Sequence, residues 1–431
     1  MADVRPFRGL RYSAGIAAHL TDVLCPPYDI ISPPGHQALQ RRSPHNAVHV
    51  ELPQGDDDQR YTRAAEELDR WRHEGVLVQD SRPSYYVQRH RFTYRGRALE
   101  RLGLTALVRL EEFDRQVVLP HEETRSAPKE DRLRLMEACR ANLSPIMSLY
   151  RDPDRRIRDI LARVSQTPPG AVASYDDSQE LAQWVVDAPE LDQAVQATLQ
   201  DAPLFIADGH HRYETALAYR DRARRRAGTW EEKDAFNYMM MTLIDFEDPG
   251  LLLLPYHRTV GGLDPATLTV LRDRLGEFFE EGPLTPMPTG PEDLEEAVIR
   301  QGTGARLGLL GPDGQGPSLL TLRHGESLDR LRAVSGGGSL HDSEGWVLHQ
   351  AILDPVLGTT AVDHVNFVHD PREAWDSVSQ GRQQMAFFVR PFPMDLFQTV
   401  VSVGHRLPSK STYFHPKLPT GLVFNPLDGE V

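Results

Sequence analysis

The sequence has very little cysteine: Cys25 and Cys139 are its only thiols in 431 residues. Two cysteines so far apart build neither a disulfide framework nor a CxxC metal site. Because disulfide-rich proteins belong to oxidising compartments, this scarcity favours a protein of the reducing cytoplasm.

Long apolar runs are also missing. The run Leu251–Leu254 is far shorter than the ~20 apolar residues that a membrane-spanning helix needs. The first ten residues hold Arg5 and Arg8 but no apolar stretch of the kind found in signal peptides. The sequence therefore predicts neither a membrane partner nor a signal peptide.

Lysine is the third scarcity, with four lysines among 48 basic residues in a chain of net charge −14. An acidic chain lacks the basic face that releases counterions from nucleic acid, so we expect no nucleic-acid partner. Lysine offers a compact, flexible ammonium where arginine offers a planar fork. Lys129, Lys410 and Lys417 fall in polar segments described below, either because they serve a site there or by chance.

Composition and pattern predict an α/β (α+β) protein. At ~150 residues per domain, the chain has room for two or three domains. We expect a core region at 1–255, a smaller α/β subdomain at 256–335, and helices and a strand at 336–431 that return a flap to the site. Residues 281–318 are rich in glycine and proline, and residues 335–339 (SGGGS) are typical of a linker.

Periodicity predicts several elements of the core region. Residues 61–74 carry an amphipathic helical stripe, and 85–94 and 101–110 resemble paired strands around Arg95-Gly96. Residues 46–52 (NAVHVEL) alternate like a strand that ends beside Glu51. A helix is expected from about 128 to 141, with Pro128 in its first turn.

The clearest candidate site is the segment 203–219 (PLFIADGHHRYETALAY). A short apolar strand ends at Asp208, Gly209 permits a tight turn, and a helix follows to about 226. This arrangement places His210, His211 and Arg212 at a helix N-terminus, where free N–H groups and the helix dipole attract phosphate. Asp208 can bind Mg²⁺ or orient a histidine; the alternative is an aspartate cap followed by two surface histidines.

A second candidate is the segment 118–132 (VLPHEETRSAPKEDR), which lacks the second histidine of the HExxH zinc pattern. His121 and Glu122 are candidates for an acid, a base or metal ligands, and Lys129 and Arg132 for phosphate contacts. The alternative is a solvated charged loop.

A third candidate lies near the C-terminus, at 407–421 (LPSKSTYFHPKLPTG). Lys410, Ser411, Thr412 and Lys417 suggest a flap that brings cations to the site, and the alternative is a frayed tail.

Weaker candidates are scattered over the chain. Tyr28 and Asp29 follow two prolines that fix a loop, and Glu51 is a candidate general base. His257-Arg258 follows an apolar strand and fits a second anion contact or a core-edge ion pair equally well. The run 220–226 is rich in arginine, and we interpret it as a solvated helix face.

Taken together, five segments resemble a bacterial and archaeal family catalogued as a domain of unknown function. They are PPYDII (26–31), LPHEETRSAPKEDR (119–132), NLSPIMSLY (142–150), IADGHHRYE (206–214) and PSKSTYFHPKLPTGL (408–422). The box IADGHHRYE is also similar to the phosphate-binding box of the ParB/sulfiredoxin superfamily, which includes free serine kinases.

The resemblance implies a ParB/sulfiredoxin-like mixed-sheet core that binds ATP or ADP and Mg²⁺ around Asp208–Arg212. It implies a nucleotide-dependent phosphotransferase of the free serine kinase type, acting on serine or phosphoserine, with a glutamate as base; Glu51, Glu122 and Glu123 are the candidates. It is compatible with a homodimer. The box lacks the cysteine of sulfiredoxin, which disfavours that activity. The alternative is a non-catalytic, ParB-type nucleotide-binding switch.

Overall fold

The computed structural model describes residues 1–431 except 56–57, 123, 125, 177, 201, 301–304, 312–315, 324, 326–327, 330–343 and 408–409. The chain forms two compact units. Unit 1 comprises Met1–Leu252 and Pro416–Val431, and unit 2 comprises Leu253–His415. Among the described helices, none is long and apolar enough to cross a membrane.

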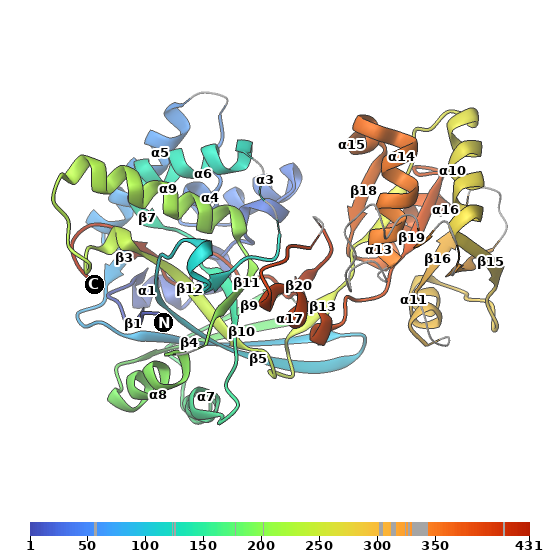
Figure 1. Cartoon of the computed structure of the whole chain (residues 1–431). Coiled ribbons are helices and arrows are strands. Elements are labelled where there is room, and N and C mark those ends of the chain that lie inside the picture. Colours follow the sequence, from blue (N-terminus) through green and yellow to red (C-terminus); the bar gives the residue numbers. More distant parts are fainter. Residues whose placement is uncertain are drawn as a thin grey trace. The chain divides into compact units, whose positions relative to one another are not determined.

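Unit 1 is built on a mixed sheet of nine strands in the order β6-β11-β8-β12-β5-β4-β10-β9, with β1 also paired to β5 (Figure 1). Strand β11 runs parallel to β6 and β12 parallel to β8, whereas β11 and β8 are antiparallel. The strands are β1 (Val4–Arg5), β4 (Tyr85–Tyr94), β5 (Arg97–Arg109), β6 (Val118–Leu119), β8 (Ile146–Tyr150), β9 (Ala171–Asp176), β10 (Gln179–Val186), β11 (Leu204–Asp208) and β12 (Tyr238–Asp245). Two small sheets pair β2 (Leu10–Tyr12) with β3 (Leu77–Gln79) and β7 (Ala141–Asn142) with β21 (Asn425–Pro426).

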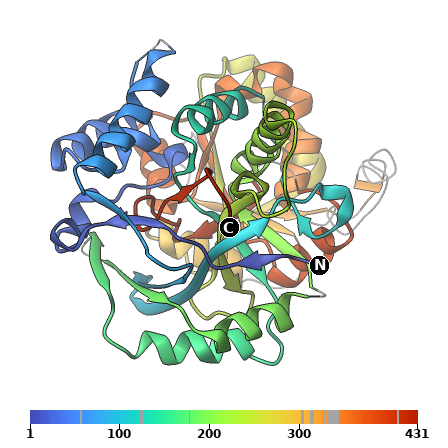
Figure 2. The same cartoon turned by 90° about the vertical axis from the view of Figure 1, so that its left-hand side faces the viewer.

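Helices cover both faces of this sheet. Figures 1 and 2 show α5, α6 and α9 on one side and α7 and α8 on the other. One buried cluster joins Val87 and Leu104 of the sheet to Ile157 of α7 and Leu191 of α8. The helical segments are α1 (Ala14–Ala17), α2 (Leu20–Val23), η1 (Tyr28–Ile30), α3 (Pro33–Arg42), α4 (Val48–Glu51), α5 (Gln59–His73), η2 (Phe113–Arg115), α6 (Ser126–Cys139), α7 (Arg156–Ser165), α8 (Pro189–Leu199), α9 (His210–Ala227) and η3 (Ala235–Asn237).

Unit 2 has its own sheet of six strands in the order β15-β17-β16-β19-β14-β18, with every pair antiparallel. These strands are β14 (His257–Val260), β15 (Phe279–Pro283), β16 (Arg306–Leu310), β17 (Ser318–Leu322), β18 (Val365–Val368) and β19 (Met385–Phe388). Strand β13 (Leu252–Leu254) pairs with β20 (Tyr413–His415). The helical segments are α10 (Pro265–Phe278), α11 (Pro291–Arg300), α13 (Glu344–Val347), the π-helix η5 (Leu348–Leu353), α14 (Asp354–Leu357), η6 (Gly358–Thr360), α15 (Ala361–His364), α16 (Pro371–Ser379) and α17 (Met394–Ser402).

The observed units differ from the three regions that we expected. The predicted boundary at 335 does not separate two bodies, because β15, β16 and β17 share one sheet with β14, β18 and β19. The expected linker at 335–339 lies outside the described residues. The last residues, 416–431, do return to unit 1, where Phe424 packs in the same cluster as Trp71 of α5.

The strand predicted at 46–52 is wrong, because Val48–Glu51 is the helix α4. The side chain of Asn46 accepts a hydrogen bond from the Val48 N–H (3.0 Å) and donates to the carbonyls of Asp22 and Leu24. The alternation of apolar and polar residues misled the prediction, because the polar Glu51 is buried together with Val48 and Val50 rather than facing solvent.

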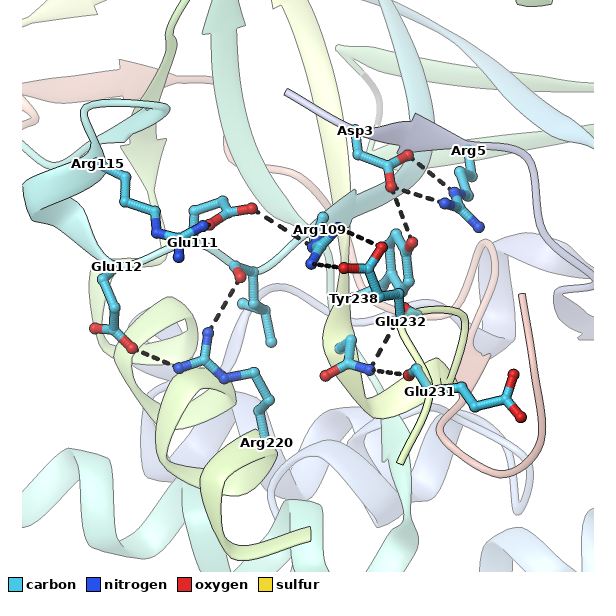
Figure 3. A network of polar contacts seen from close by, with 12 residues as sticks. Asp3, Arg5, Arg109, Glu111, Glu112, Arg115, Arg220, Glu231, Glu232 and Tyr238 are labelled. Atoms are coloured by element: carbon cyan, nitrogen blue, oxygen red, sulfur yellow. Dashed lines mark hydrogen bonds and ion pairs between the residues drawn. The ribbon is translucent and has the colours of Figure 1, made fainter. Parts of the chain in front are cut away.

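The arginine run 220–226 is also not simply a solvated face. Figure 3 shows Arg220 of α9 directed at Glu112, and it also donates to the Leu110 carbonyl at 3.1 Å. Arg224 lies over the Trp230 ring, 3.8 Å from its centroid. Arg220 thus reaches acceptors more than one hundred positions away in the sequence, which helical periodicity does not encode.

Candidate functional site

The predicted strand–turn–helix is confirmed at Asp208–Arg212. Strand β11 ends at Asp208, and α9 begins at His210. Gly209 between them has φ of 101°, and a Cβ there would lie 3.0 Å from Nε of Arg212. Only glycine combines that conformation with that close approach at low cost. The first N–H groups of a helix lack partners within it, so the turn presents donors beside the Asp208 carboxylate.

Both oxygens of the Asp208 carboxylate contact cations. Nη2 of Arg212 lies 2.6 Å from Oδ2, and Nζ of Lys417 contacts Oδ1. All three side chains are nearly buried, with exposed fractions of 13% for Asp208, 8% for Arg212 and 10% for Lys417. One carboxylate thus gathers two cations at the start of α9.

Two histidines lie beside this turn. The His121 N–H donates to Nε2 of His210 at 3.1 Å, and the two rings meet edge to face with centroids 4.4 Å apart. Nδ1 of His121 lies 2.7 Å from the Ile206 carbonyl, which fixes Nδ1 as the protonated nitrogen because a carbonyl only accepts. Burial lowers the pKa of His121 to about 4, so this imidazole is neutral at pH 7.

His121, Glu122 and His210 also form a candidate metal centre, since one ligand atom from each lies within 4.8 Å of the others. Two imidazoles and a carboxylate suit a transition metal better than Mg²⁺, which prefers oxygen ligands. His211, the next residue of α9, is partly exposed, and Glu123 lies outside the described residues.

Lys129 lies on α6 and contacts α9. Its Nζ is 2.7 Å from Oε2 of Glu214, and the Thr124 hydroxyl donates to the same oxygen at 2.6 Å. Sequence reasoning missed Glu214, although helical periodicity gives a signal, because Glu214 follows His210 by four residues and shares its face.

Glu51 and Arg132 lie in a buried polar cluster. Glu51 is 2% exposed and accepts a hydrogen bond from the Ser144 hydroxyl at 3.1 Å. Nη1 of Arg132 donates to the Glu51 carbonyl at 2.6 Å, and its guanidinium lies 4.3 Å from the centroid of the Tyr28 ring. Burial raises the pKa of Glu51, whereas Arg132 and Arg212 act to lower it.

Glu51 also lines a cavity together with Arg212 of α9. This cavity, of about 30 Å³, is lined by Glu51, Arg132, Ser144 and Arg212 among others. Burial raises the pKa of Tyr28 to about 12, against the effects of Arg212 and Arg132. Like Glu214, Ser144 was not among the site residues predicted from sequence. It contacts Glu51 and lies in the motif NLSPIMSLY.

The remaining predicted residues belong to unit 2. Nζ of Lys410 lies 5.1 Å from the centroid of the Tyr256 ring, Ser411 lines a cavity described below, and Thr412 is buried. Their contribution to the site around Asp208 stays a prediction. By contrast, Lys417 and the segment around His121 do meet this site, as expected from sequence.

Comparisons with solved structures give distant likenesses. A conserved hypothetical protein from Pyrococcus furiosus is 14% identical, with 74% of this chain and 94% of that chain covered and a TM-score of 0.34. A free serine kinase in complex with AMP is 13% identical, with 75% and 91% covered and a TM-score of 0.36. SbnI with a C-terminal truncation, from Staphylococcus aureus, is 12% identical, with 75% and 87% covered and a TM-score of 0.37. We transfer no residue role from likenesses this distant.

Among curated proteins, no sequence match was found. The family model described as "Protein of unknown function (DUF1015)" matches residues 4–340, which is most of the chain. The chain therefore belongs to the DUF1015 family.

Proposed function

We propose that this protein is a nucleotide-dependent phosphotransferase that acts on a small hydroxyl compound. The observation that carries the proposal is that Arg212 and Lys417 both contact Asp208 at the start of α9, while Glu51, from a distant part of the sequence, lines one cavity with Arg212. A helix N-terminus with two nearby cations suits phosphate, and a buried carboxylate with a raised pKa suits a general base.

In the proposed reaction, the nucleotide phosphates lie against the N–H groups at the start of α9. Lys417 and Arg212 neutralise their charge while remaining close to Asp208. The acceptor hydroxyl oxygen attacks the terminal phosphorus as its proton passes to the Glu51 carboxylate. The bond from phosphorus to the bridging oxygen breaks, and its electron pair leaves with the nucleotide product. Such catalysis consists mostly of positioning and charge neutralisation.

The residues present fit Mg²⁺ only in part. Asp208 is an oxygen ligand of the preferred type, but both its oxygens already contact cations. In the proposed reaction, Arg212 and Lys417 therefore neutralise the phosphate charge without Mg²⁺. The nucleotide, ATP or ADP, and the acceptor, with serine and phosphoserine first to test, follow from the resemblance to the phosphate-binding box and the free serine kinases.

Two variants test the proposal. We expect Glu51→Gln to bind ADP or ATP as the wild type does and to lose about 10²–10⁴-fold in turnover of serine or phosphoserine. We expect Asp208→Asn to weaken nucleotide binding by at least about tenfold, because Arg212 and Lys417 lose the carboxylate that positions them. Calorimetric titration measures binding, and product analysis measures turnover.

The matched control is Arg225→Gln, which changes an exposed arginine on the same helix. It should leave both quantities unchanged. Unaltered nucleotide affinity in Asp208→Asn would contradict the site assignment. Tight nucleotide binding without turnover in the wild type would contradict the phosphotransferase and favour a nucleotide-binding switch.

A further inference from the structure

Unit 2 contains a cavity that the proposed function does not use. Its volume is about 370 Å³, which lies within the range of about 300–1,000 Å³ typical of small-molecule pockets. All its lining residues belong to unit 2. They are Arg258, Ile299, Glu344, Gly345, Trp346, Val389, Arg390, Pro391, Phe392, Pro393, Leu396 and Ser411.

The charged residues of this cavity do not balance. Glu344 is the acidic residue among those that line the cavity, and it forms an ion pair with Arg390. Arg258 is 3% exposed, and among the described residues its hydrogen bonds reach only uncharged acceptors. These are the carbonyls of Tyr256 and of Lys410 (3.4 Å) and Nε2 of His349 (3.3 Å). Within the part of the chain that the structure describes, this buried positive charge therefore has no carboxylate within ion-pair distance.

A buried, uncompensated guanidinium is costly, and an anion that enters the cavity removes that cost. Burial lowers the pKa of Arg258 to about 10, although Glu344 nearby acts to raise it. A guanidinium has five N–H donors, and Arg258 uses three in the bonds above, so two remain, one on each Nη. Two parallel N–H groups on one fork match the two oxygens of a carboxylate.

The surroundings hold this fork in place and leave room beside it. Phe367 packs against the guanidinium, which lies 5.4 Å from the ring centroid. Gly345 of α13 also lies close to the guanidinium. A Cβ at this position would lie 3.4 Å from Nη2 of Arg258. Because glycine has no side chain, the cavity next to Nη2 stays open.

The rest of the lining is largely apolar, with Trp346, Phe392 and Leu396 among its members. A single unbalanced cation suits a monoanion better than a phosphate dianion, and the apolar wall suits a hydrophobic body. We propose that unit 2 binds a small monocarboxylate with an apolar body, its carboxylate on Arg258 and its body against Trp346, Phe392 and Leu396.

Calorimetric titration of the full chain with hexanoate and phenylacetate tests this proposal, with hexanamide and inorganic phosphate as the comparison probes. We expect at least one carboxylate to bind about tenfold or more tightly than hexanamide and inorganic phosphate. Binding of neither carboxylate, or stronger binding of hexanamide or phosphate, would overturn the proposal.

Variants then locate the bound carboxylate. Arg258→Gln removes the cation, and Gly345→Val fills the space beside it without a change of charge, so each should weaken binding by about tenfold or more. Gly345→Val remains informative if Arg258→Gln fails to fold. Arg372→Gln, an exposed arginine of α16, and Asp208→Asn in unit 1 should leave carboxylate affinity unchanged. Equal affinity in wild type and Gly345→Val would place the carboxylate elsewhere and overturn the assignment.

Discussion

Each unit buries more than one arginine, and Arg212 of unit 1 and Arg258 of unit 2 have different partners. Arg212 in unit 1 meets the Asp208 carboxylate at 2.6 Å, whereas Arg258 in unit 2 donates to two carbonyls and an imidazole nitrogen. Burial acts to lower the pKa of both. Asp208, Asp29, Tyr28 and Glu51 together outweigh burial, so the pKa of Arg212 is raised, while the pKa of Arg258 falls to about 10.

This comparison shows that burial alone does not define an anion site. The charge of Arg212 is compensated by the protein, so a phosphate at α9 gains most from the second cation, Lys417, and from the helix N–H groups. Among the described residues, no carboxylate lies within ion-pair distance of Arg258, and Glu344 acts on it only from farther away. An external anion therefore has more to gain at Arg258 than at Arg212 alone.

Removing each arginine should give the largest difference between the units. Arg212→Met should lower the free energy of unfolding by about 3–5 kcal/mol, because it breaks a buried ion pair. Arg258→Met should cost about 1–3 kcal/mol, because it leaves acceptors without donors but no carboxylate in direct contact. Chemical denaturation of the full chain, followed by probes of each unit, measures both losses. Equal losses would contradict the comparison.

The pH dependence of unit 1 should come next in size. His121 has a pKa of about 4 in the folded protein and an ordinary value near 6.5 when unfolded, so the unfolded state binds more protons between these values. Stability from this residue is complete above pH 6.5 and is lost as the pH falls towards 4, by about 3 kcal/mol in all. His121→Asn should flatten that slope in unfolding measurements across this range. His73→Asn, an exposed residue of α5, is the control and should retain the wild-type slope.

The smallest effects should separate the two lysines of unit 1. Lys417 is 10% exposed where it meets Asp208, whereas Lys129 is 35% exposed where it meets Glu214. Lys129→Met should change stability by no more than about 1 kcal/mol, as for most exposed ion pairs. Lys417→Met should cost more and should also weaken nucleotide binding. Thermal midpoints with and without ADP distinguish the two, and equal midpoint changes would contradict the difference in burial.

Local sequence predicted the elements that depend on short-range chemistry. The hairpin of β4 and β5 forms around Arg95-Gly96, where both residues adopt positive φ, and α5 buries Tyr61, Leu68 and Trp71 as its periodicity indicates. The strand, glycine and helix at 204–227 are as expected. The helix at 48–51 was missed because Asn46, which precedes it, is held by hydrogen bonds to the carbonyls of Asp22 and Leu24, more than twenty positions away.

The sequence by itself determined the strand–glycine–helix turn at Asp208–Arg212, because a strand end, a glycine and a helix start are all local features. Only the tertiary structure decided which charges meet there. Lys417, which contacts Asp208, is 209 residues away from it in the sequence. Glu51 and Arg212 line the same cavity although they lie far apart in the sequence. The same holds for Arg258, for which the sequence left open an anion contact or an ion pair. Its partners His349 and Lys410 are far away in the sequence and meet it only in the folded unit. Charge compensation depends on distance in space, which no local pattern records.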